Sequence, residues 1–136
     1  MILPFPRPQE AAMKRVLVVD DAATVRLYYR DVLEAAGFAV DEAVNGLEGL
    51  EKALADAFDL FLVDVNMPKM DGYRFLSTAR REPALRAVPA IMISTEAKDS
   101  DAARAYAAGA NLYMVKPVQP DTLFRTVALM TGGPVS

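Results

Sequence analysis

Carboxylates follow two apolar segments of the chain that have the composition of buried strands. Asp20 and Asp21 come directly after residues 16–19 (VLVV), and Asp64 comes directly after residues 60–63 (LFLV). In an open parallel sheet the carboxyl ends of all strands lie at one edge, where such sheets bind their ligands. Like charges packed together raise one another's pKa unless a cation neutralises them, and a hard divalent cation with oxygen ligands does so best. We therefore expect a Mg2+ site with a carboxylate available for chemistry.

Two further apolar segments end in residues that could serve the same site. Residues 90–93 (AIMI) are followed by Ser94, and residues 112–115 (LYMV) are followed by Lys116 and Pro117. A parallel sheet would bring this hydroxyl and this ammonium to the edge that carries the acids. Each residue also has an ordinary structural interpretation, as a helix cap, a turn residue or a solvated charge. Their convergence at one predicted edge favours the functional interpretation.

The segments between these strands have the periodicity of amphipathic helices. An apolar stripe follows Asp21 at helical spacing, and Gly37 supplies a stop. Residues 38–43 form a short predicted strand, and Asn45-Gly46 leads into a second helix. The first stripe consists of Val25, Tyr28, Tyr29, Val32, Leu33 and Ala36. The second stripe consists of Leu47, Leu50, Leu54 and Phe58.

Three more helices are predicted in the second half of the chain. The third ends at Pro83, and its inward positions are Phe75, Leu76 and Ala79. The fourth takes its N-cap from residues 99–101 (DSD) and ends at Gly109. The fifth begins at Pro120, and its inward positions are Leu123, Phe124, Val127 and Met130. Strands that alternate with single helices indicate βαβ units and a parallel sheet, so the predicted fold class is α/β.

The composition excludes several classes of function. A chain of 136 residues suits one domain, and 53% apolar with 24% charged residues is typical of a soluble globular protein. The net charge of -3 and the pI of about 4.9 argue against a nucleic-acid partner, which requires a basic face. The chain has no cysteine and no histidine, which excludes thiolate catalysis, a Ser-His-Asp triad and histidine-ligated zinc. It also means that the chain cannot itself carry a phosphohistidine.

The ends of the chain differ from its middle. Residues 1–12 are rich in proline and predict a disordered N-terminal extension, and Met13 is an alternative start. Residues 13–131 form the predicted domain, and residues 132–136 a short tail. The start lacks a signal peptide, and no apolar stretch is long enough to span a bilayer, so we expect a cytoplasmic protein without membrane insertion.

Four motifs, in this order, resemble those of bacterial two-component response-regulator receiver domains. They are VVDD at 18–21, DVNMPKMDG at 64–72, STEAK at 94–98 and KP at 116–117. Within that family the chain is most similar to the stand-alone chemotaxis regulators of the CheY type. The resemblance covers about residues 14–131 and implies a flavodoxin-like, doubly wound sheet of five parallel strands in the order 2-1-3-4-5, with five helices in a single domain.

The resemblance also implies a role for each residue of the site. Asp64 would be the phosphoacceptor, and it would attack the phosphorus of a phosphohistidine on a partner sensor histidine kinase of the CheA type. Mg2+ would be bound by the side chains of Asp20, Asp21 and Asp64 and by the backbone carbonyl of Asn66. Lys116 would pair with the phosphoryl oxygens, and the peptide bond between Lys116 and Pro117 would be cis.

The resemblance further implies two residues that give the response and two that tune dephosphorylation. Ser94 would hydrogen-bond the phosphoryl group and draw its loop inward. Tyr113 matches the aromatic residue that turns from an exposed to a more buried position in this family. Asn66 and Glu96 would tune dephosphorylation, because both flank the phosphoryl group and would admit an attacking water.

Several functions remain open at this stage. The leading one is a phosphorylation-controlled switch in chemotaxis or motility, with a flagellar motor switch protein or another protein as its target. A phosphate sink, which drains the kinase without a target, is an alternative, because residues 99–102 (DSDA) lack the basic and large apolar residues of motor-binding members. An aspartate-nucleophile phosphatase would need an acid where Asn66 stands. A flavodoxin-like electron carrier would need a phosphate loop, and Asp20-Asp21-Ala22-Ala23 would repel phosphate.

Overall fold

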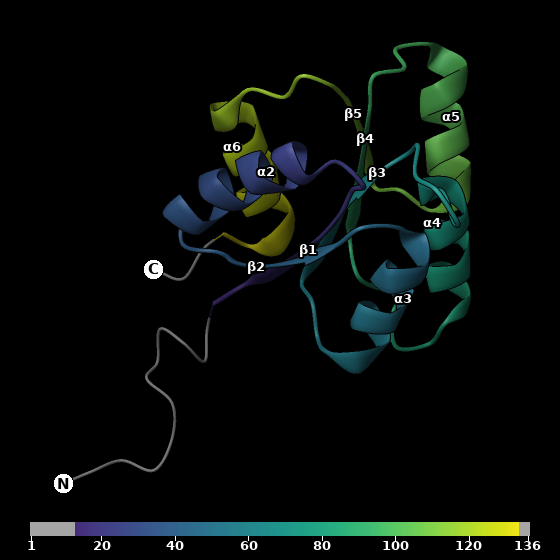
Figure 1. The fold of residues 1–136 in the computed structure, drawn as a ribbon, viewed down its shortest axis with the longest axis horizontal. Coiled ribbons are helices and arrows are strands. Elements are labelled where there is room, and N and C mark those ends of the chain that lie inside the picture. Colours follow the sequence, from purple (N-terminus) through teal and green to yellow (C-terminus); the bar gives the residue numbers. More distant parts are fainter. Residues whose placement is uncertain (1–12, 134–136) are drawn as a thin grey trace, which may run out of the picture.

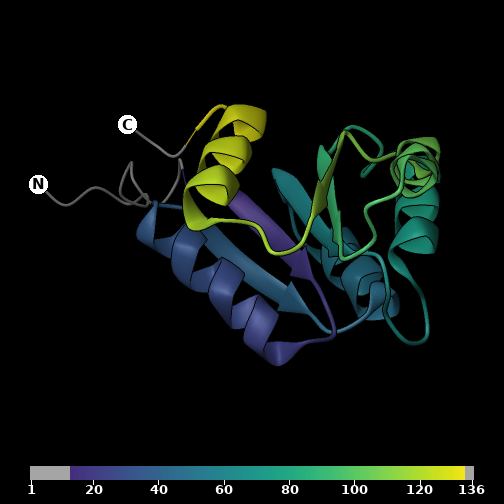
Figure 2. The same cartoon turned by 90° about the horizontal axis from the view of Figure 1, so that it is seen from above.

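A computed structural model describes residues 13–133 as a parallel sheet of five strands covered by helices on both faces (Figures 1 and 2). The strand order is β2-β1-β3-β4-β5, which confirms the expected order and fold class. The strands are β1 (Arg15–Val19), β2 (Ala39–Ala43), β3 (Leu60–Asp64), β4 (Ala90–Ser94) and β5 (Leu112–Val115). The helices are α2 (Ala23–Ala35), α3 (Gly46–Ala55), α4 (Gly72–Arg81), α5 (Asp99–Ala108) and α6 (Pro120–Thr131).

The hydrophobic core has two layers, one on each face of the sheet. Helices α2 and α6 cover one face, and α3, α4 and α5 cover the other, as Figure 1 shows. Strand β1 illustrates the alternation, because Leu17 and Val19 point to the second layer while Val16 and Val18 point to the first. A strand covered on both faces is apolar throughout, which explains the continuous apolar segments of the sequence.

The register of the strands determines which residues meet at the carboxyl edge. Val19 of β1 lies opposite Val63 of β3, so the residues that follow them, Asp20 and Asp64, are neighbours. Ser94, the last residue of β4, lies opposite Val115 of β5. The parallel pairing therefore brings residues that are far apart in the sequence to one edge.

Glycines end two of the helices as expected. Gly37 follows α2 with a φ of 97°, and Gly109 follows α5 with a φ of 115°, a conformation that costs other residues free energy. The N-cap predicted for α5 is wrong by one residue. Lys98 is the N-cap, and Asp101 lies in the first turn, where its carboxylate accepts a hydrogen bond from the Lys98 backbone N–H. The acidic residues thus stabilise the helix start from inside the first turn.

The apolar stripe predicted for α3 is wrong in part. Leu47 and Leu54 are exposed, whereas Gly46, Gly49 and Ala53 are the buried positions of this helix. A Cβ on Gly49 would lie 3.0 Å from the Phe75 ring and 3.1 Å from a Val19 methyl carbon. Small residues therefore allow α3 to approach β1 and α4 closely, and this contact turns the larger leucines to solvent.

Two predictions about the chain ends concern residues that the structure does not describe. The disordered extension predicted for residues 1–12 and most of the tail predicted for residues 132–136 lie outside residues 13–133. Of the helices in the described part of the chain, none is long and apolar enough to cross a bilayer.

Candidate functional site

Three carboxylates meet at the carboxyl edge of the sheet. Asp20, Asp21 and Asp64 each offer an oxygen, and these oxygens lie within 4.8 Å of one another. Asp20 and Asp64 are buried, with 1% and 7% of their surface exposed, whereas Asp21 is open to solvent. Within residues 13–133 this is the one cluster of acidic groups with the spacing of a metal site.

A single ammonium lies between the two buried acids. The Nζ of Lys116 is 3.0 Å from Oδ1 of Asp64 and 3.3 Å from Oδ2 of Asp20. The peptide bond between Lys116 and Pro117 is cis, which is the geometry that the resemblance implied. The backbone N–H of Lys116 donates to the Ser94 carbonyl. This bond continues the pairing of β4 with β5 and fixes the start of the loop that carries the lysine.

The charges of the site shift the pKa of Asp64 and of Lys116. Burial raises the pKa of the Asp64 carboxyl. The ammonium of Lys116 opposes this rise, while the charges of Asp20 and Asp21 add to it, and the pKa remains raised. Burial alone would lower the pKa of Lys116, but its hydrogen bond and charge interactions with the two buried acids outweigh this effect and raise it. Three carboxylates against one ammonium leave the site with excess negative charge.

Ser94 and Tyr113 are both connected to the backbone of Glu96. Ser94 is buried, and its Oγ accepts a hydrogen bond of 3.1 Å from the Glu96 N–H. The Tyr113 hydroxyl donates to the Glu96 carbonyl at 2.5 Å, and its side chain is half-buried. The turn of Tyr113 from an exposed to a more buried position, which the resemblance implies, stays a prediction.

The loop after β3 is held close to the phosphoacceptor candidate by Gly72. The Gly72 N–H donates to the Val65 carbonyl at 2.9 Å, and a Cβ on Gly72 would lie only 2.3 Å from the Asp64 carbonyl oxygen. Asn66 is exposed on this loop, two residues after Asp64, and Glu96 is exposed two residues after Ser94. Their predicted roles, in binding Mg2+ and in dephosphorylation, stay predictions.

Sequence reasoning missed three residues of α2 that contact the site or its loops. Arg26 donates to the Asp20 carbonyl at 2.7 Å, and Tyr28 donates through its hydroxyl to the Val118 carbonyl at 2.7 Å. The pKa of Tyr29 is raised by burial and by the nearby charges of Asp20 and Asp64, so its hydroxyl stays protonated. Both tyrosines lie in the apolar stripe that the sequence predicts for the first helix. Their hydroxyl groups were the one feature of the sequence that indicated an additional polar contact.

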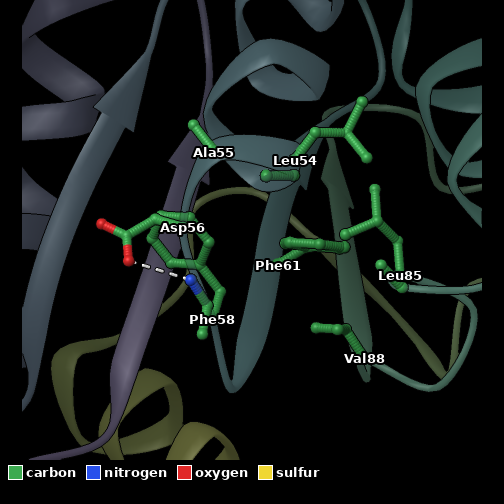
Figure 3. Close-up of a pocket in the computed structure, with 10 residues that line it drawn as sticks. Leu54, Ala55, Asp56, Phe58, Phe61, Leu85 and Val88 are labelled. Carbon is green, nitrogen blue, oxygen red and sulfur yellow. Dashed lines mark hydrogen bonds between the residues drawn. The ribbon is translucent and has the colours of Figure 1, made fainter.

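A hollow of about 450 Å³ lies at the opposite edge of the sheet, between the end of α3, the start of β3 and the segment that precedes β4 (Figure 3). Figure 3 shows Leu54, Phe61, Leu85 and Val88 around it. Asp56 is the one titratable residue that lines it, and its carboxylate is exposed and forms an ion pair of 2.6 Å with Arg15. The hollow offers no second group for chemistry, so the acidic edge is the candidate site.

Comparison with known proteins identifies relatives of this arrangement. The family model for the response regulator receiver domain matches residues 16–128. The transcriptional regulatory protein ResD of Bacillus subtilis is 36% identical over 117 residues, which cover 85% of this chain and 48% of ResD. The sensor histidine kinase CheAY of Helicobacter pylori is 38% identical over 114 residues, which cover 82% of this chain and 14% of that kinase. The chain thus spans less than half the length of these two relatives.

A solved structure matches over nearly its full length. The chemotaxis protein CheY4 of Vibrio cholerae superposes with a TM-score of 0.84 at 36% sequence identity. The match covers 88% of this chain and 99% of the CheY4 chain. The similarity therefore extends over the sheet and the helices that position the acidic edge.

Proposed function

Because the chain belongs to the response regulator receiver domain family, we propose that Asp64 accepts a phosphoryl group from a phosphohistidine of a sensor histidine kinase, in a Mg2+-dependent reaction. One observation carries the assignment to Asp64. It is the buried carboxylate that lies both in the acidic cluster and at 3.0 Å from the Lys116 ammonium, at the end of the central strand β3.

The residues of the acidic edge fit Mg2+. The donors of Asp20, Asp21 and Asp64 are all carboxylate oxygens, which this ion prefers, and the excess negative charge of the buried site favours a cation. We assign the metal to these three side chains and to the backbone carbonyl of Asn66. When bound, Mg2+ would offset negative charge on the transferring phosphoryl oxygens.

The chain's own residues supply the nucleophile and a counter-charge. A carboxylate oxygen of Asp64 forms a bond to phosphorus while the P–N bond to the donor histidine breaks, and the bonding electron pair leaves with the imidazole nitrogen. Lys116, already at hydrogen-bonding distance from Asp64, pairs with the phosphoryl oxygens as a point charge. The Ser94 hydroxyl donates a hydrogen bond to the same group. Phosphoryl transfer depends on such positioning and electrostatics more than on further covalent chemistry.

The response would pass through the loop of residues 94–98 to strand β5. Ser94 and Tyr113 both bond the backbone of Glu96, so a movement of Ser94 toward the phosphoryl group also moves the carbonyl that holds the tyrosine. Any shift between two states requires such a differential interaction. The partner would bind the face formed by α5, β5 and α6, where Val115 is 43% exposed.

We propose a cytoplasmic role in chemotaxis or motility, with a kinase of the CheA type as the phosphoryl donor. The named relatives CheAY and CheY4 support this role. This chain is, however, as similar in sequence to the transcriptional regulatory protein ResD as it is to CheY4, at 36% identity to each. The target would be a flagellar motor switch protein or another protein. A phosphate sink is the second candidate, and the acidic start of α5, with Asp99 and Asp101 in its first turn, favours it.

Acetyl phosphate labelling tests the phosphoacceptor directly. In the presence of Mg2+ the wild-type protein should take up phosphate, and Asp64→Asn should abolish the uptake. Asp31→Asn changes an exposed aspartate on α2 in the same chemical way and serves as the matched control, which should label like the wild type. Labelling of Asp64→Asn at the wild-type level would overturn the assignment.

A further inference from the structure

A hydrogen bond from Tyr28 connects helix α2 to the loop between β5 and α6. The Tyr28 hydroxyl donates to the carbonyl of Val118 at 2.7 Å, and the two residues are 90 positions apart in the sequence. Val118 is buried and follows Lys116 by two residues. The bond therefore acts on the segment that carries the ammonium of the site.

The Lys116 loop is held at two points, one on each side. On the β4 side the Lys116 N–H donates to the Ser94 carbonyl at 2.8 Å. On the α2 side the attachment is the Tyr28 hydrogen bond to Val118. The ammonium of Lys116 reaches Asp64 from between these two points. Without the Tyr28 bond, the backbone of the lysine would keep its hydrogen bond to β4, and Val118 would keep its packing in the core.

A groove of about 400 Å³ separates much of this loop from α2. It is lined by Val25, Tyr28 and Tyr29 on the helix and by residues 116–119 on the loop. A gap removes the van der Waals contacts that would otherwise hold two elements together. The hydrogen bond of Tyr28 thus crosses a groove in which α2 and the loop do not pack against each other. The position of the loop relative to α2 therefore depends more strongly on this single bond.

We propose that Tyr28 is a positioning residue for Lys116, and that its bond to Val118 keeps the ammonium in reach of a phosphoryl group on Asp64. The inference rests on the proposed function, because it concerns the same site. A side chain held in the productive position by its surroundings binds its ligand with less loss of freedom. The acids that would bind Mg2+ lie outside the loop of residues 116–119, so the loss of the Tyr28 bond should weaken phosphoryl binding without weakening metal binding.

Tyr28→Phe tests the proposal, because it removes the hydroxyl and keeps the ring. With saturating Mg2+, the affinity for beryllofluoride, a phosphoryl mimic, should fall by about threefold to tenfold, the range expected for one hydrogen bond. The Mg2+ affinity should not fall. The Lys116 ammonium repels the cation, and this repulsion does not increase when the loop of the lysine is less restrained. Tyr106→Phe makes the same change at an exposed tyrosine of α5 and should bind both ligands like the wild type.

A double-mutant cycle with Lys116→Met separates positioning from a general structural role. If Tyr28 acts through the lysine, Tyr28→Phe should have no further effect in the Lys116→Met protein. If beryllofluoride binding is then too weak to measure, the rate of acetyl phosphate labelling supplies the same cycle. Both probes are small molecules, so a contact between Tyr28 and a kinase does not influence the result.

The outcomes distinguish this inference from the proposed function. A wild-type protein that binds no beryllofluoride with Mg2+ present would overturn both. A Tyr28→Phe protein that binds as tightly as Tyr106→Phe would overturn the positioning role alone. An equal loss from Tyr28→Phe with and without Lys116, or a parallel loss of Mg2+ affinity, would also overturn it.

Discussion

The Nζ of Lys116 lies 3.0 Å from Oδ1 of Asp64, although 52 positions separate the two residues in the sequence. The same ammonium contacts Asp20, so one positive charge serves two buried carboxylates. The three carboxylates of the site therefore carry more negative charge than this one ammonium neutralises, which favours a bound cation.

Mg2+ should stabilise the folded protein, because it relieves repulsion among Asp20, Asp21 and Asp64. At a concentration of 100 times Kd the gain should be about 2.7 kcal/mol. Asp21→Ala removes the exposed carboxylate of the acidic cluster and should abolish most of this gain, whereas Asp31→Asn should retain it. Thermal melts with Mg2+ and with a chelator measure the effect. A melting temperature that does not respond to millimolar Mg2+ would contradict the metal site.

The stability of the metal-free protein should fall with rising pH because of Asp64. Its pKa is raised above the ordinary value of 3.8 in the folded state, so between 3.8 and the raised pKa the folded protein binds more protons than the unfolded chain. Raising the pH through this window therefore favours unfolding. The stabilising contribution is complete below the window and lost above it.

Asp64→Asn removes this dependence and supplies the measurement. The free energy of unfolding of the variant should increase relative to that of the wild type as the pH rises through the window. Urea denaturation without divalent cations at several pH values determines the difference. Glu42, whose pKa is lowered by its arginine partners despite the opposing effect of burial, acts in the opposite direction in both proteins and cancels. A difference that is independent of pH would contradict the raised pKa.

Gly72→Ala should destabilise the protein and slow its phosphorylation. The added Cβ would lie 2.3 Å from the backbone oxygen of Asp64, so the start of α4 and Asp64 must move apart. We expect a loss of about 1–3 kcal/mol in the free energy of unfolding. Thr78→Ala, at a half-buried position of the same helix, is the control. Urea denaturation and acetyl phosphate labelling together measure both effects, and unchanged labelling would show that the loop tolerates the shift.

Ser94→Ala should permit phosphorylation but weaken the conformational response. In the proposed function the hydroxyl donates a hydrogen bond to the phosphoryl group, and its loss would remove part of the free energy that favours the inward position of residues 94–98. Amide chemical shifts with and without beryllofluoride should change from Ser94 to Tyr113 in the wild type and less in the variant.

Tyr113→Phe removes the bond to the Glu96 carbonyl and tests the second half of the same connection. Beryllofluoride should still shift the amides near Ser94, but the shifts in β5 should shrink. Wild-type shifts that stay constant from Ser94 to Tyr113 with the ligand bound would contradict the switch and favour the phosphate sink.

Local sequence patterns predicted the elements well where one physical preference dominates. The continuous apolar segments predicted four of the five strands, three of them buried and β5 a half-buried edge strand. Gly37 and Gly109 marked helix ends because glycine tolerates a positive φ. Hydrophobic periodicity did not predict the buried face of α3. Leu47 and Leu54 are exposed on this helix, and glycine and alanine occupy its buried face. A pattern of hydrophobicity carries no information on how closely two elements approach each other.

The chain by itself determined which chemical groups are available: carboxylates, one hydroxyl and one ammonium at strand ends, without histidine or cysteine. It determined their common edge as well, because parallel strands must end together. The tertiary structure decided the distances between these groups and the shifts in their pKa. The register of β1 on β3 brought Asp20 beside Asp64, and burial there raised the pKa of the Asp64 carboxyl. The bond of Tyr28 to Val118 joins α2 to a loop 90 residues away, and only packing of both elements on the same sheet face creates such a contact.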